Sequence, residues 1–106
     1  MARLSKPFIP DGPIRSYYDR LHELHQAAGQ PSVRQIQRAT RCTRWPNGIN
    51  PTTVHDVFVK PRLARWEVVQ EIAWRLGGDV KELAALWRRA REAQLNHGLA
   101  VDSDDA

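Results

Sequence analysis

The chain has 106 residues, of which 42% are hydrophobic and 26% are charged, a composition ordinary for one globular domain. Its 16 Lys and Arg outnumber its 12 Asp and Glu, and the pI near 9.8 favours an acidic partner, nucleic acid before an anionic membrane. Cys42 is the single cysteine, which excludes an intramolecular disulfide and fits a reducing compartment. Signal-peptide and transmembrane patterns are missing, so we expect a cytoplasmic protein with no membrane contact.

Residues 1–12 are expected to form an N-terminal arm without regular structure, because two prolines and a glycine fall within them. Arg3 and Lys6 leave open the alternative that this arm enters a DNA minor groove. The first helix should begin at Pro13 and end before Gly29. Its core face is predicted from residues at helical spacing: Ile14, Tyr17, Tyr18, Leu21, Leu24 and Ala28.

A second helix should start after Ser32, since Gln35 three residues later completes a capping-box pattern, and it should stop near Arg41. Val33, Ile36 and either Ala39 or Thr40 should face inward. Residues 42–49 include Pro46-Asn47-Gly48 and predict a loop, with Trp45 packed on its own domain. The third helix should begin with Asn50 as its cap and end at Lys60-Pro61.

A fourth helix is predicted from about Arg65 to Leu76, ending at Gly77-Gly78, and a fifth from Val80 to about Gln94. Asp79 should cap the fifth helix with Glu82 as its capping-box partner, and Trp66 and Trp87 should belong to the core. The fold class is therefore all-α, a compact five-helix bundle. Its expected divisions are the arm (1–12), the helical domain (13–94) and an acidic, flexible tail (95–106).

Basic residues concentrate between Gln30 and Trp66. This stretch holds seven Lys or Arg and one acid, Asp56, which gives a local charge of +6, more than the +4 of the whole chain. The outward residues of the helix after Asn50 are short and polar. A polar helix flanked by arginines is suited to a DNA major groove and the phosphates beside it. Double-stranded DNA is therefore the expected partner.

Four segments carry a resemblance to a known family: Ser32–Thr40, Asn50–His55, Pro61–Val69 and Leu76–Val80. From about Val33 to Ala93 the chain resembles the phage-repressor (Cro/repressor-like) helix-turn-helix family of small bacterial regulators. The resemblance implies a helix-turn-helix formed by the second and third helices. The connection at 41–49 is longer than that family's usual turn.

Candidate DNA contacts follow from the resemblance together with the charge pattern. The expected base contacts are Thr52, Thr53, His55 and Asp56. The expected phosphate contacts are Ser32, Arg34, Gln35, Arg41, Arg44, Lys60, Arg62 and Arg65. A homodimer is expected, because one short helix reads few base pairs.

Other functions fit the sequence less well. No nucleophile–base pair, phosphate loop or carboxylate pair is recognisable, so we expect neither an enzyme nor a cofactor. His22 and His25 lack a third ligand nearby, so no metal site is expected. The alternative is the same fold used as a protein-interaction module, with Trp74 and the last helix, which carries Leu86, binding a protein partner. RNA binding lacks the exposed aromatic residues that single-stranded bases require.

Overall fold

A computed structural model describes residues 4–96, and all regular secondary structure within that range is helical. The helices are α1 (Pro13–Ala27), α2 (Val33–Ala39), α3 (Pro51–Val59), α4 (Trp66–Arg75) and α5 (Val80–Asn96). The predicted all-α, five-helix architecture is confirmed. The predicted boundaries differ from the observed ones by at most about two residues.

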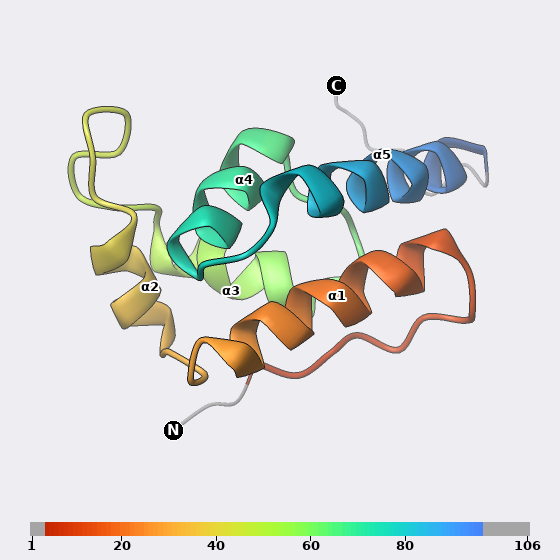
Figure 1. The fold of residues 1–106 in the computed structure, drawn as a ribbon, viewed down its shortest axis with the longest axis horizontal. Coiled ribbons are helices and arrows are strands. Elements are labelled where there is room, and N and C mark those ends of the chain that lie inside the picture. Colours follow the sequence, from red (N-terminus) through yellow and green to blue (C-terminus); the bar gives the residue numbers. More distant parts are fainter. Residues whose placement is uncertain (1–3, 97–106) are drawn as a thin grey trace.

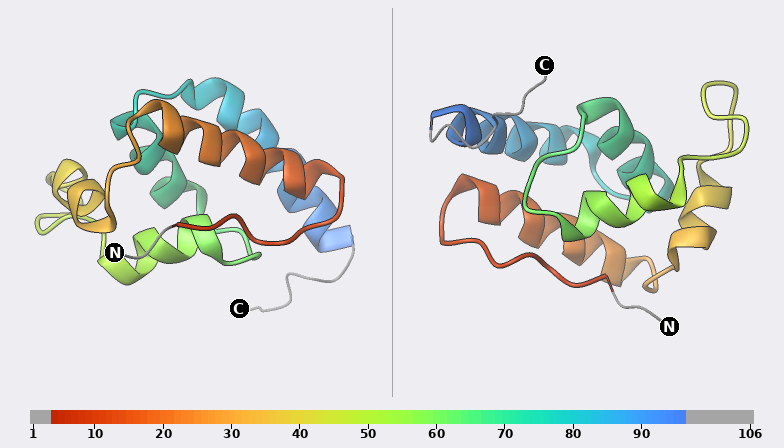
Figure 2. Two further views of the ribbon diagram at one scale, coloured as in Figure 1. Left: turned by 90° about the horizontal axis from the view of Figure 1, so that it is seen from below. Right: turned by 180° about the vertical axis from the view of Figure 1, so that it is seen from behind.

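The two long helices, α1 and α5, lie side by side and antiparallel, and α1 runs from one end of the molecule almost to the other (Figure 1). α2 and the loop that follows it lie at the other end of the longest axis, and α3 and α4 fill the space between. Figure 2 shows that α3 and the segment 60–65 lie behind α1 in the view of Figure 1, and α3 packs against α1 with one face. The exposed surface of α3 is therefore flanked by α2 at one end and by the segment 60–65 at the other.

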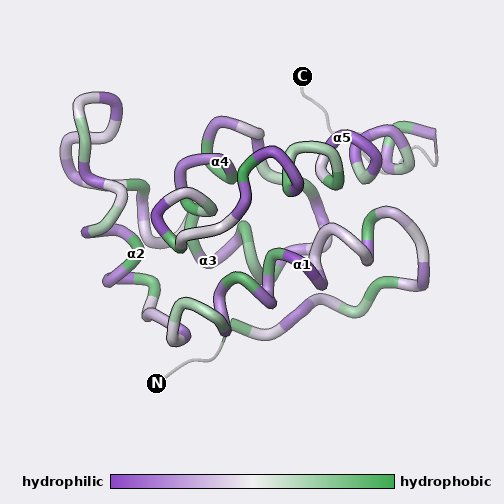
Figure 3. The backbone as a smooth tube through the Cα atoms, viewed as in Figure 1, coloured by the Kyte–Doolittle hydropathy of each residue, from purple (hydrophilic) through white to green (hydrophobic). Residues whose placement is uncertain are grey.

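The core forms where the apolar faces of these helices meet. Hydrophobic and hydrophilic residues alternate along the helices (Figure 3), the pattern of helices with one buried face. The apolar side chains with no exposed area are Tyr17, Leu21, Val54, Phe58, Val69, Ile72, Ala73, Leu83 and Ala90. Trp66 and Trp87 are half-buried at its edge and pack on each other, with 5.8 Å between ring centroids. Ala28, expected in the core, is exposed because α1 ends at Ala27.

Local signals in the sequence explain the starts of the short helices. Ser32 and Gln35 form the predicted capping box, and Asn50 Oδ1 accepts a hydrogen bond from the Thr52 backbone N–H at 2.8 Å. At the end of α2, Thr40 and not Ala39 is the buried residue. The Thr40 hydroxyl oxygen accepts a bond from the Ile49 N–H at 2.9 Å, which ties the end of α2 to the residue before α3.

At the start of α5, the predicted cap residue Asp79 is confirmed, but the predicted capping-box bond from Glu82 is not formed. Asp79 Oδ1 accepts a hydrogen bond from the Glu82 backbone N–H at 3.1 Å, so Asp79 does cap the helix. The Glu82 carboxylate, however, bonds the Arg20 guanidinium of α1 at 2.9 Å. A side chain engaged with a neighbouring helix is not free to return the capping bond. Glu82 therefore links α5 to α1.

Polar side chains of α1 hold the ends of both α2 and α3. The Tyr18 hydroxyl donates to the Lys60 carbonyl at 2.8 Å, and His22 Nε2 lies 2.8 Å from the Phe58 carbonyl. His25 Nε2 lies 2.8 Å from the carbonyl of Pro31, just before α2. A carbonyl only accepts, so Nε2 of each histidine carries the proton. The bonds to Phe58 and Lys60 satisfy backbone acceptors that the C-terminal end of a helix otherwise leaves unpaired.

The described part of the arm, residues 4–12, folds back along α1. Lys6 Nζ contacts Asp19 Oδ1 at 2.8 Å, and Leu4 and Ile9 pack against the core. Residues 4–12 contain no helix or strand, as expected, and the arm is nevertheless attached at several points. Arg3, named as a minor-groove candidate, lies outside the described residues, as does the acidic tail beyond Asn96.

Burial of His22 gives a prediction about pH. Loss of hydration lowers the pKa of His22 below its ordinary value of 6.5, against the opposing effect of the bond to the Phe58 carbonyl. The unfolded chain thus binds a proton at a higher pH than the folded chain does. The contribution of His22 to the free energy of unfolding is complete above about pH 6.5 and should be lost as the pH falls through the lower folded-state pKa.

Urea unfolding of the wild type and of His22→Gln between about pH 7.5 and pH 5 measures this effect, because glutamine keeps a donor for the Phe58 carbonyl without titrating. The wild type should lose more stability on acidification than the variant. Parallel curves would show that His22 does not control the pH dependence.

Candidate nucleic-acid interface

The first turn of α3 presents two exposed hydroxyl side chains. Pro51 fixes the backbone at the first helical position, and the Asn50 side chain caps the turn, so Thr52 and Thr53 are held at a defined helix start. Both threonines are exposed, while Val54 on the opposite face is fully buried. The first turn can therefore offer hydroxyl and methyl groups to a ligand without losing core contacts.

The other two predicted base contacts, His55 and Asp56, are only half-buried and interact with each other. His55 Nδ1 lies 3.4 Å from Asp56 Oδ1, and Lys60 Nζ lies 3.7 Å from Asp56 Oδ2. Lys60 offsets the negative charge of Asp56 one helical turn away. This pairing reduces the repulsion that a carboxylate would otherwise exert on DNA.

At the start of α2, the side chains of Ser32 and Gln35 are engaged with each other's backbone. Gln35 Oε1 accepts from the Ser32 N–H at 2.7 Å, and Ser32 Oγ accepts from the Gln35 N–H at 3.1 Å. These two predicted phosphate contacts therefore have a structural role in capping α2. Any phosphate contact from this helix has to come mainly from its arginines.

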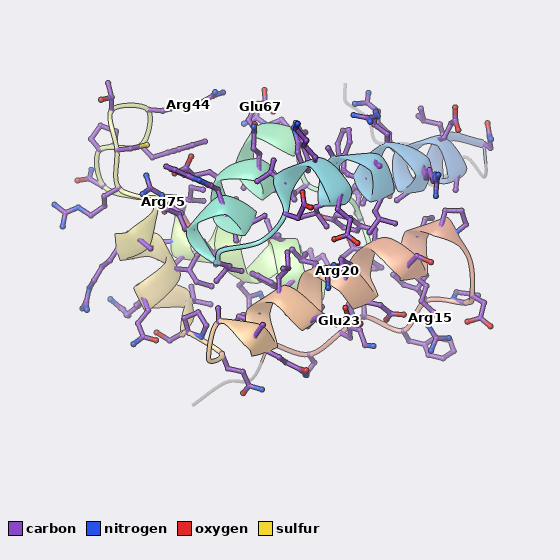
Figure 4. The ribbon with its side chains drawn as sticks, in the orientation of Figure 1. Arg15, Arg20, Glu23, Arg44, Glu67 and Arg75 are labelled. Carbon is purple, nitrogen blue, oxygen red and sulfur yellow. The ribbon has the colours of Figure 1, made fainter. Side chains whose placement is uncertain are left out.

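Arginines differ between the two sides of the molecule in how their charge is balanced. On α1, Arg15 lies 2.8 Å from Asp11, and Arg20 bonds Glu23 at 2.9 Å and also Glu82 (Figure 4). Another set of arginines is exposed and makes no ion pair with any residue in 4–96: Arg34, Arg38, Arg41 and Arg65. Unneutralised arginines are the ones available to bind phosphate oxygens. Arg38 counts among them although it was not selected from the sequence.

The loop at 41–49 has internal hydrogen bonds despite its length. The Trp45 carbonyl accepts from the N–H groups of Cys42 at 3.0 Å and Gly48 at 2.9 Å, and the Gln37 amide donates to the Asn47 carbonyl at 3.1 Å. Trp45 packs against the edge of the core, as expected. The additional residues therefore form an ordered projection beside α2, and both ends of the loop remain tied to the domain.

Arg44 projects from this loop over the Trp45 ring, with its guanidinium carbon 5.0 Å from the ring centroid. Figure 4 shows Arg44 extending toward Glu67 of α4, and their nearest atoms are 3.8 Å apart. An exposed pair at that distance contributes little and is readily exchanged for another anion. Arg44 is thus oriented by Trp45 and can exchange Glu67 for a phosphate.

The segment 60–65, which carries the remaining predicted phosphate contacts, is fixed through its backbone. Besides the bond from Tyr18 to Lys60, the Leu63 N–H donates to Gln94 Oε1 at 3.2 Å, and the Trp87 indole N–H donates to the Ala64 carbonyl at 3.0 Å. The side chains of Lys60, Arg62 and Arg65 are exposed. The backbone is therefore rigidly attached to α1 and α5 while the cations face outward.

Sequence reasoning missed the groups that hold this face in place. His22 and His25 were considered only as metal ligands, whereas each binds a backbone carbonyl and both pack on the Phe58 ring at 5.5 and 5.1 Å. Their three-residue spacing on an otherwise apolar stripe of α1 was the available signal. Residues 4–96 contain no cluster of three potential metal ligands.

Comparisons with protein-family models, with curated proteins and with solved structures give no match to this chain. None of the helices within residues 4–96 has the length and apolar character needed to cross a bilayer.

The loop yields a prediction at Gly48. Its φ is +80°, and a Cβ atom there would overlap the backbone carbonyl of Gln37. Gly77 is a matched control, since its φ is +81° and a Cβ atom there would meet nothing within 4 Å. Gly77→Ala should lower the free energy of unfolding by about 1–2 kcal/mol through its backbone conformation alone. Gly48→Ala should lower it by more, because the loop must also shift.

Urea denaturation of both variants and the wild type supplies the comparison. Equal losses in the two variants would mean that the close approach of Gly48 to α2 does not constrain the loop.

Proposed function

We propose that this protein binds double-stranded DNA sequence-specifically and regulates transcription, with α3 placed in the major groove. The observation that carries the proposal is the exposed, capped first turn of α3, together with four exposed arginines near it in the chain that no described acid neutralises, Arg34, Arg38, Arg41 and Arg65. A groove-reading helix needs polar side chains free to reach base edges and cations beside it for the phosphates. The surface of α3 satisfies both requirements.

The proposed roles divide along this surface. Thr52 and Thr53 contact base edges, and His55 with Asp56 follows one turn later. Arg34, Arg41 and Arg44 hold phosphates on the α2 side. Lys60, Arg62 and Arg65 hold them on the other side of α3.

Thr52 tests base recognition. Thr52→Ala keeps a good helix former at an exposed position, so the fold should persist. Binding to the preferred duplex should weaken by roughly 1–3 kcal/mol, with little change on unrelated duplexes. Competition binding on both duplexes measures the difference, and circular dichroism verifies the fold. Gln70→Ala, an exposed polar-to-alanine change on α4, should leave both affinities unchanged.

The alternative is a protein-interaction module. Trp74 on α4 and Leu95 on α5 favour it, because they are large apolar side chains with 58% and 57% of their areas exposed. If the wild type discriminates among no duplexes and Thr52→Ala has no effect, this alternative replaces DNA binding.

We further propose a symmetric homodimer through α5, because a nine-residue helix reads too few base pairs alone. Leu86, the α5 residue expected to contact a protein partner, is half-buried against its own core. Light scattering should give a dimer on a palindromic duplex. A wild-type monomer both free and on the palindrome would contradict the dimer.

A further inference from the structure

A second group of unpaired cations lies on α5. Arg88 and Arg91 are exposed, one helical turn apart, and neither makes an ion pair within residues 4–96. Neither residue was among the candidate contacts derived from the sequence. Glu82, the acidic residue of α5 that pairs with Arg20 of α1, lies on a different face of α5 from these two arginines.

These arginines border the segment that carries Lys60, Arg62 and Arg65. The Arg91 guanidinium lies over the Trp87 ring, 5.5 Å from its centroid, and the same indole donates its N–H to the Ala64 carbonyl. Gln94, one turn further on, bonds the Leu63 N–H. The C-terminal half of α5 is therefore attached directly to the proposed phosphate-binding segment.

Within residues 4–96, three arginines have their guanidinium carbon over a tryptophan ring, and they differ in whether an acid neutralises them. Arg75 lies over Trp74 but is held by Glu71 at 2.7 Å. Arg91 has no acid in the described chain. A guanidinium held over an aromatic face by a cation–π contact can still donate hydrogen bonds to an anion, so the contact with Trp87 restricts Arg91 without neutralising it.

The arrangement in space is suited to a duplex. Figure 2, seen from below, shows the C-terminal end of α5 descending to the side on which α3 and the segment 60–65 lie. The loop at 41–49 and α5 lie toward opposite ends of the longest axis, which measures 35 Å. One turn of B-DNA is about 34–36 Å long.

We propose that Arg88 and Arg91 extend the phosphate-binding surface onto α5, so that a DNA duplex is gripped on both sides of α3 over about one helical turn. This inference rests on the proposed DNA binding and adds to it a second set of phosphate contacts. Arg89, which is also exposed, lies about 100° away from Arg88 around the helix, on the face that carries Glu82, whose carboxylate bonds Arg20 of α1. It provides a control of equal charge on the same helix.

The test measures the salt dependence of binding to a duplex of about 20 base pairs, long enough for the full contact surface. The variants are Arg88→Gln/Arg91→Gln, Arg89→Gln, and Arg41→Gln as a comparator on the α2 side. Each lost phosphate contact should lower the slope of log K against log salt by about 0.9, which is roughly an 8-fold loss at 0.1 M salt relative to 1 M. Arg88→Lys/Arg91→Lys keeps both charges and should retain most of the slope, and thermal unfolding verifies folding of each variant.

The double glutamine variant should lose up to two contacts while Arg89→Gln loses none. An unchanged slope in the double variant, or an equal decrease in Arg89→Gln, would overturn the proposal even if the Arg41→Gln slope falls. If the wild type binds no duplex at 0.1 M salt, DNA binding itself is contradicted. That result differs from an unchanged slope in the double variant, which contradicts only the contacts from α5.

Discussion

Hydrogen bonds from α1 to the backbone around α2 and α3 are the interactions on which the exposed face depends. His25 holds the carbonyl just before α2, and His22 and Tyr18 hold carbonyls at and beyond the end of α3. Because all three donors are on one rigid helix, they fix the distance between the start of one short helix and the end of the other. α2 has seven residues and α3 nine, too few to be stable alone, so their geometry is set by α1.

This arrangement separates the part of the molecule that determines geometry from the part offered to a partner. The fixing groups are buried side chains and backbone carbonyls, whereas Thr52, Thr53 and the unpaired arginines are exposed. The long connection after α2 does not weaken the arrangement, because the Thr40–Ile49 bond closes its base. Substitutions on the exposed face can therefore change recognition with little effect on the fold.

Local signals were sufficient to predict most of the fold. Capping residues such as Ser32 and Asn50 act within a few positions of themselves, so their effect can be read from neighbouring letters. Long-range choices could not be read in this way. Glu82 bonds Arg20 on another helix, and His22 bonds a carbonyl 36 positions away. For the same reason the sequence indicated a basic surface but not which arginines are neutralised. Arg15 is paired with Asp11, whereas Arg38 has no ion pair within residues 4–96.

Selection of bound sequences from a random duplex pool at about 0.1 M salt tests most directly whether the face around α3 reads DNA. We expect enrichment of one short motif, arranged as an inverted repeat with half-sites about one helical turn apart. A pool that keeps its random composition after repeated rounds, with folded protein present throughout, would contradict sequence-specific DNA binding.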